Sequence, residues 1–184
     1  GPRTAVTGGR LEYAWIPAAL GGTERRIGYV RIPSFVAGGW DGGAEMDAAL
    51  RALPGAAALV VDVRGNTGGS ESIASAVAAR LYDLARVYRT APFRDGPGHA
   101  HFAAPMTFSV APAGVRFAGP VALLTDRDVA SAAEDFTLML RVLPQAVVVG
   151  DTTNGTSSNP RVERLANGWT LRIPQSIQTT PEGL

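Results

Sequence analysis

Hydrophobic positions along this chain form short continuous runs that are separated by polar or glycine-rich segments. Runs at 11–16 and 27–32 have the length and composition typical of β-strands. Three more runs, at 58–63, 120–125 and 146–149, contain almost no polar residue. Continuous runs of this kind are typical of strands that are covered on both faces of a parallel sheet, so we expect three buried strands.

Other segments repeat their apolar residues every three or four positions, which is the period of an amphipathic helix. This spacing predicts helices over 45–53, 70–84 and 130–143. We expect the core-facing stripes of these helices to consist of Met46, Ala49, Leu50 and Leu53, then Ile73, Val77, Ala78, Leu81 and Leu84, and finally Ala133, Phe136, Leu140 and Leu143.

Shorter strand candidates complete the pattern. Segments 86–90 and 106–110 are possible strands on either side of a loop rich in glycine, proline and histidine at 93–105. Segment 161–174 is predicted to be a hairpin that turns at an Asn-Gly pair. The alternation of strands and helices predicts an α/β fold with a central sheet flanked by helices. Because no linker is visible, we expect residues 1–184 to form a single domain.

The composition excludes several kinds of chemistry. The chain has no cysteine, and all 17 basic residues are arginine, because lysine does not occur. Disulfides, a cysteine nucleophile, Schiff-base chemistry and any Ser–Lys pair are therefore excluded. The net charge of +1 is spread along the chain without a basic block, which argues against a nucleic-acid partner. No apolar run reaches the roughly 18–20 residues of a membrane-spanning helix, so we expect no such span in this chain.

Two strand–turn–helix segments carry the residues with candidate chemistry. After the first of the buried strands, a glycine-rich loop at 64–69 leads into a helix, and Asp62 and Arg64 are placed to pair and brace this loop. After the second, Ser131 stands among small residues where a helix begins. A serine there is commonly a helix cap. The same position also suits a nucleophile, because a helix N-terminus stabilises developing negative charge.

Three motifs together resemble those of the tail-specific, or C-terminal processing, serine proteases. Segment 61–69 (VDVRGNTGG) is similar to the Asp-Leu-Arg-x-Asn-x-Gly-Gly motif of that family, and 130–136 (ASAAEDF) is similar to its nucleophile segment. Segment 148–155 (VVGDTTNG) is similar to its next strand and Gly-Glu-x-Thr-x-Gly loop. The motifs occur in the family's order and cover about residues 25–184. Within this family, the sequence resembles the branch that contains the tricorn core and the interphotoreceptor retinoid-binding protein repeats more than it resembles the other branches.

The resemblance implies a crotonase/ClpP-like fold of repeated β-β-α units and a peptidase reaction. Ser131 corresponds to the nucleophile, and the backbone N–H of Ala132, together with that of Gly68 or Gly69, would form the oxyanion hole. The resemblance also implies a peptide or protein substrate that is recognised near its C-terminus, and neither a metal nor an organic cofactor. No PDZ-type module is visible within the chain.

The general base is where this sequence departs from the family pattern. Many members use a lysine after the Gly-x-Thr-x-Gly loop, and the corresponding residue here is Thr156. The tricorn-like branch instead uses a histidine from a segment before this domain. We expect this chain to be a piece of a longer protein, in which case the base lies outside it. His99 and His101 are the alternatives within the chain, although histidines in such a loop are commonly exposed residues without a catalytic role.

Two other functions stay open on the sequence alone. A non-proteolytic module that binds an apolar ligand or a peptide can have the same fold, and the missing lysine favours it. A nucleotide site at 64–69 is less well supported, because this loop lacks the Gly-x-Gly-x-x-Gly spacing. The absence of cysteine is compatible with a bacterial protein that functions outside the cytoplasm, which is the location we expect.

Overall fold

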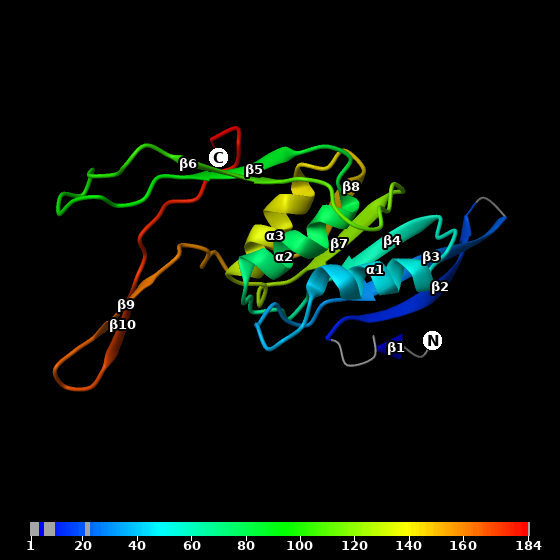
Figure 1. Ribbon diagram of the computed structural model, residues 1–184, viewed down its shortest axis with the longest axis horizontal. Helices are drawn as coiled ribbons and strands as arrows, with labels where there is room; N and C mark the ends of the chain where they lie inside the picture. Colours follow the sequence, from blue (N-terminus) through cyan, green and yellow to red (C-terminus); the bar gives the residue numbers. More distant parts are fainter. Residues whose placement is uncertain (1–3, 6–9, 21–22, 184) are drawn as a thin grey trace.

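A six-stranded sheet is the base of the fold in the computed structural model, which describes residues 4–5, 10–20 and 23–183 (Figure 1). Its strands lie in the order β1 (Thr4–Ala5), β2 (Glu12–Leu20), β3 (Thr23–Arg31), β4 (Ala58–Asp62), β7 (Val121–Thr125) and β8 (Ala146–Gly150). The first three pair in antiparallel fashion, whereas β3, β4, β7 and β8 are parallel. The carboxyl ends of β4, β7 and β8 therefore meet at one edge of the sheet, which is where ligand sites form in parallel sheets.

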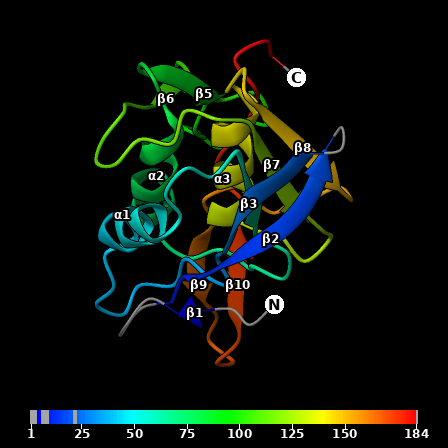
Figure 2. The ribbon, with the colours of Figure 1, turned by 90° about the vertical axis from the view of Figure 1, so that its right-hand side faces the viewer.

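Helices connect the parallel strands and cover one face of the sheet (Figure 2). They are α1 (Gly42–Ala52), α2 (Glu71–Ala78), which continues as the short 3-10 helix η1 (Ala79–Leu81), and α3 (Ala132–Arg141). Asp41 caps α1 and Ser70 caps α2, each by accepting a hydrogen bond from a backbone N–H in the first turn. The structure thus confirms the α/β class with a central sheet flanked by helices.

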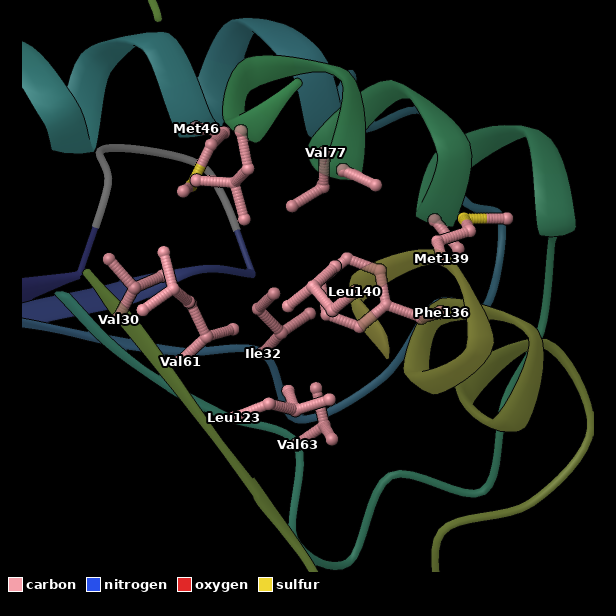
Figure 3. Packing of buried hydrophobic residues seen from close by; sticks show 14 of the residues in the cluster. Val30, Ile32, Met46, Val61, Val63, Val77, Leu123, Phe136, Met139 and Leu140 are labelled. Carbon is pink, nitrogen blue, oxygen red and sulfur yellow. The ribbon is translucent and has the colours of Figure 1, made fainter. Parts of the chain in front are cut away.

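The main core lies between the sheet and these helices (Figure 3). Val30, Val61 and Leu123 occupy matching register positions on β3, β4 and β7, and all three are fully buried. They face the apolar stripes of the helices, which include Phe136 on α3. The Phe136 ring lies 5.2 Å from the ring of Phe35, centroid to centroid, so α3 packs against the segment after β3, which itself pairs with the glycine-rich loop at Gly69.

Two antiparallel ribbons extend the structure beyond the main sheet (Figure 1). The first pairs β5 (Arg86–Ala91) with β6 (Met106–Val110), and β5 contacts α3. The second is the hairpin of β9 (Arg161–Arg164) and β10 (Thr170–Ile173), which projects away from the main sheet. The sequence predicted the second ribbon as a hairpin and predicted β5 and β6 as strands, but it did not predict that these two strands pair.

Two sequence-based expectations about burial are wrong. The run at 146–149 was expected to be buried, but Val147, Val148 and Val149 are 40–59% exposed, because β8 is the edge strand of the sheet. Leu84 was expected on the buried stripe of a helix over 70–84. It is 51% exposed, because the helical segment ends at Leu81. The other stripe residues are buried, apart from the half-buried Ile73.

No helix in the described part of the chain combines the length and apolarity needed to cross a bilayer.

Candidate active site

The turn after β4 and the turn after β7 lie against each other at the carboxyl edge of the sheet. The N–H of Gly65 donates to Asp126 Oδ1 at 3.1 Å, and the N–H of Ala130 donates to the carbonyl oxygen of Asn66 at 3.1 Å. These bonds join the glycine-rich loop to the segment that ends at Ser131. The two motifs that the sequence analysis singled out thus form one site.

The first turn is braced by an ion pair. Arg64 donates from Nε to Asp62 Oδ1 at 2.9 Å and from Nη2 to Oδ2 at 2.7 Å, and Tyr29 Oη donates to Oδ2 at 2.6 Å. Burial raises the pKa of the Asp62 carboxyl, but the hydrogen bonds from Arg64 and Tyr29 outweigh this effect and lower it to about 2. The expected pairing of Asp62 with Arg64 is confirmed.

Asn66 fixes the shape of the glycine-rich loop from inside. Its side chain is fully buried, donates from Nδ2 to the carbonyl oxygen of Ile32 at 3.0 Å, and accepts the N–H of Gly68 at 2.9 Å. Gly68 has a φ of 98°, and a Cβ there would lie 2.6 Å from the carbonyl oxygen of Ala130. Only glycine fits at this position, so the loop backbone can lie directly beside Ser131.

Ser131 itself has an unusual backbone. Its φ is 54° and its ψ is −126°, a region that residues other than glycine rarely adopt. Such a conformation costs on the order of 1–3 kcal/mol and persists only where the surroundings impose it. The side chain is exposed at the edge of the sheet, directly before α3. A strained, exposed serine between a strand and a helix is the arrangement that presents a hydroxyl to a substrate.

The carboxylate of Glu134 imposes this conformation. It accepts three backbone N–H groups: that of Ser131 at 3.0 Å, that of Gly155 at 2.6 Å and that of Thr156 at 2.8 Å. Glu134 is only 6% exposed. One buried carboxylate therefore ties the turn of Ser131 to the loop that follows β8, and both segments keep a fixed position relative to each other.

Two backbone N–H groups beside Ser131 have no acceptor among the described residues. One belongs to Ala132, the first residue of α3, where a helix leaves its N–H groups unpaired. The other belongs to Gly69. The N–H of Gly68, in contrast, is used by Asn66. Of the alternatives drawn from the sequence, the geometry thus favours Ala132 with Gly69 as the donor pair.

Ser131 lies between two cavities. The first has a volume of about 350 Å³ and includes Gly69, Ala132, Arg89 and Asp135 in its wall; we call it the ion-pair cavity. The second has a volume of about 360 Å³ and is lined by Thr67, Thr156, Ser158, Arg172, Ala130, Pro160 and Pro174; we call it the hydroxyl cavity. An extended chain that crosses Ser131 would place its side chains or ends in these two spaces.

The ion-pair cavity takes its name from a buried charge network. Arg89, whose side chain is 4% exposed, lies 3.2 Å from Asp135 Oδ1 and 2.8 Å from Glu71 Oε1. Ser157 Oγ also donates to Asp135. Burial raises the pKa of the Asp135 carboxyl to about 6, although Arg89 opposes this rise. A perturbed carboxyl beside an exposed serine is common at functional sites.

The histidines lie apart from this site. His99 and His101 are in the loop between β5 and β6, both are exposed, and neither lines the two cavities at Ser131. His101 accepts a hydrogen bond from the N–H of Gly98 within its own loop. Thr156, in contrast, lines the hydroxyl cavity together with Ser131. The part of the chain that the structure describes holds no cluster of three or more metal-ligating side chains.

Sequence reasoning missed the residues that join distant segments. Arg89 sits in a strand of mixed polarity, and no local pattern marks it as buried. Arg172 follows an ordinary alternation in a hairpin. Glu134 carried a weak signal as the third residue of a helix after a serine, which is the spacing of a capping box. Its bonds to the distant Gly155 and Thr156 had no signal in the sequence.

Comparisons with known proteins agree with this geometry. The model of Peptidase family S41 matches residues 26–184. A solved structure described as a "putative peptidase from Parabacteroides merdae" is 30% identical over 95% of this chain and 53% of its own length, with a TM-score of 0.83. The photosystem II D1 C-terminal processing protease is 23% identical over 96% of this chain and 45% of its own, with a TM-score of 0.74.

Mature CPAF is 16% identical over 100% of this chain and 49% of its own, with a TM-score of 0.85, so this likeness shows the fold alone. The chain spans about half the length of these solved structures. A comparison with curated proteins finds no match.

Proposed function

Because this chain belongs to peptidase family S41, we propose that Ser131 is the nucleophile of a serine peptidase that acts through an acyl-enzyme. The family match confirms the resemblance drawn from the three motifs, and it implies a peptide or protein substrate. One observation carries the role of Ser131: it is an exposed serine at a φ of 54°, beside the N–H groups of Gly69 and Ala132, which have no acceptor among the described residues.

The reaction divides into two steps. The Ser131 Oγ attacks the carbonyl carbon of the scissile peptide bond while a base takes its proton. The N–H groups of Gly69 and Ala132 stabilise the oxyanion, and the loss of one such donor typically lowers kcat by about 10²–10³-fold. Proton transfer to the amine nitrogen breaks the C–N bond, releases the amine product and leaves an ester on Ser131. Water then hydrolyses this ester and restores the hydroxyl.

The base is the missing part of the proposed machinery. The chain contains no lysine, and no histidine of the described residues lines either cavity at Ser131. Glu134 already accepts three N–H groups, and Asp135 is paired with Arg89. The proposal therefore requires a base from outside these 184 residues, or a rearrangement that brings His99 or His101 to Ser131.

Recognition near the substrate C-terminus is part of the same proposal. The likeness to a C-terminal processing protease supports it, at 23% identity. A location outside the cytoplasm is likewise proposed and rests on the absence of cysteine. The binding-module alternative is not favoured, because the family is one of peptidases and the exposed Ser131 stands beside unpaired donors.

Peptide hydrolysis tests the proposal. The natural protein that contains this chain is incubated with unfolded casein, and new amino termini are identified by mass spectrometry. We expect cleavage by the wild type and none by Ser131→Ala. The variant Ser70→Ala removes a serine from the N-terminus of α2 instead and should leave cleavage intact. Equal cleavage by wild type and Ser131→Ala would refute the assignment of the nucleophile, and absence of cleavage by the wild type would refute the peptidase reaction.

A further inference from the structure

The hydroxyl cavity beside Ser131 contains an isolated positive charge. Among the described residues that line it, Arg172 is the only charged one. The polar remainder of the wall, apart from Ser131, consists of the hydroxyl residues Thr67, Thr156 and Ser158. None of the described carboxylates lines this cavity, so a negatively charged group that enters it meets a guanidinium and hydroxyl donors without a repelling partner from these residues.

Arg172 reaches this position from the hairpin of β9 and β10. Its cross-strand partner is Val162, and Thr170 pairs with Arg164, so these four side chains share one face of the hairpin. Arg172 lines both cavities at Ser131, which places this face toward the candidate site. Pro160 and Pro174 flank the hairpin and also line the hydroxyl cavity. Their fixed φ limits the freedom of the segment that carries Arg172.

The charge of Arg172 is not used within the described structure. Other arginines near the site are paired: Arg89 with Asp135, Arg127 with Asp151 at 2.6 Å, and Arg161 with Glu163. Arg172 has neither an ion pair nor a hydrogen bond to a described residue, and the hydroxyls of Thr67 and Ser158 likewise have no such partner. These donors remain available to a ligand.

The ion-pair cavity differs from the hydroxyl cavity because carboxylates line it. Its buried arginine, Arg89, is already held by the carboxylates of Asp135 and Glu71. Arg172 also lines this cavity, so an additional carboxylate there would meet its guanidinium, but it would lie beside the negative groups of Asp135 and Glu71 as well. The hydroxyl cavity therefore suits an anion better, because Arg172 acts there without a carboxylate from the described residues.

We propose that Arg172 binds a carboxylate of the peptide substrate in the hydroxyl cavity and so determines specificity next to the scissile bond. This inference rests on the proposed peptidase function of Ser131. The carboxylate is either the C-terminus of the peptide or the side chain of an aspartate or glutamate near the cleaved bond. Both sources present the planar group that a guanidinium binds with two parallel hydrogen bonds.

The experiment compares matched peptides with the natural protein that contains this chain. A peptide spanning a cleavage site found in casein is made with its acidic residues intact or replaced by the amides, and with a free or an amidated C-terminus. We expect removal of the recognised carboxylate to lower kcat/KM about tenfold, as for the loss of a charge-assisted hydrogen bond. If kcat/KM falls only when the C-terminus is amidated, the recognised carboxylate is the terminal one. If it falls only when one acidic residue is replaced, the recognised carboxylate is that side chain.

Variants assign this preference to one residue. Arg172→Gln should abolish the tenfold preference, and Arg172→Lys should retain part of it as a point charge. Arg164→Gln removes the same charge from the same face of the hairpin without touching either cavity, so it should keep the full preference. An undiminished preference in Arg172→Gln, or an equal loss in Arg164→Gln, would overturn the proposal.

A binding measurement separates this inference from the peptidase function. Casein-derived peptides in matched acid and amide forms, chosen whether or not casein is cleaved and labelled with a fluorophore, are titrated with the Ser131→Ala protein, and anisotropy reports binding without turnover. Tighter binding of the carboxylate peptides that disappears in Ser131→Ala/Arg172→Gln supports the inference even where hydrolysis fails. Equal binding of acid and amide peptides contradicts it, even where the wild type cleaves casein.

Discussion

Replacement of Ser131 by glycine should stabilise the protein while it removes the proposed nucleophile. Ser131 has a φ of 54° and a ψ of −126°, which glycine adopts without a steric penalty. Strain of this kind costs about 1–3 kcal/mol, and its relief stabilises the folded state of the variant. Glycine also makes the unfolded chain more flexible, which costs about 0.5–1 kcal/mol. The expected net gain is about 1 kcal/mol, or about 2–4 °C in Tm for a protein of this size.

Two variants control for the change of residue type. Ser131→Ala keeps a Cβ at the strained position, so its free energy of unfolding should stay within about 0.5 kcal/mol of wild type. Ser70→Gly makes the same exchange at the N-cap of α2, where φ is −89° and the side chain accepts the N–H of Ile73. We expect it to lose about 0.3 kcal/mol.

Urea unfolding followed by circular dichroism measures these differences, provided that the m-values agree. A higher free energy of unfolding for Ser131→Gly, together with a lower one for Ser70→Gly, supports the inference that the backbone of Ser131 is strained. If both variants lose stability by the same amount, Ser131 is not strained, and the reasoning from its backbone is refuted.

Further predictions concern the groups around Ser131. Glu134→Gln leaves at least one of the three N–H groups that the buried Glu134 carboxylate accepts without its partner, and it should cost about 2 kcal/mol in urea unfolding, whereas the exposed Glu182→Gln should change little; equal effects would contradict the role of Glu134. The pKa of Asp62 is lowered to about 2, so its stabilisation of about 2 kcal/mol is present above pH 4 and is lost as the pH falls toward 2. The free-energy difference between wild type and Asp62→Asn should therefore shrink over this range, and a constant difference would contradict the prediction. The pKa of Asp135 is raised to about 6, so its ionisation opposes folding as the pH rises from 4 to 6. Asp135→Asn should gain about 3 kcal/mol relative to wild type between pH 4 and pH 7, and a pH-independent difference in unfolding free energy would refute the raised pKa.

The sequence was sufficient for the elements whose signals are local. The apolar period of α3 predicts its buried face correctly at Phe136 and Leu140, and the glycine-rich loop and Ser131 were located by their positions between strand and helix. Burial of β8 was misjudged because an apolar run does not reveal whether a neighbouring strand lies on both sides. Its exposure is a property of the sheet as a whole.

The walls of the site depended on contacts between segments far apart in the sequence. Arg89 meets Glu71 and Asp135 only because β5 packs near the starts of α2 and α3. Arg172 lines the cavities at Ser131 because of the path of the hairpin, which a strand pattern does not specify. The choice between Gly68 and Gly69 as a donor needed the side-chain bond of Asn66. These are tertiary contacts, and no alternation or spacing of residues in a single sequence predicts them.

Labelling with a fluorophosphonate probe tests the nucleophilic role of Ser131 most directly. The probe is applied to this chain and to the natural protein that contains it, and the modified residue is identified by peptide mass spectrometry. We predict one adduct, on Ser131, that is absent from Ser131→Ala. Labelling of the 184-residue chain would place the base within it, with His99 and His101 as the next substitutions, whereas labelling of the natural protein alone would place the base outside. No adduct on Ser131 in either protein would contradict the assignment.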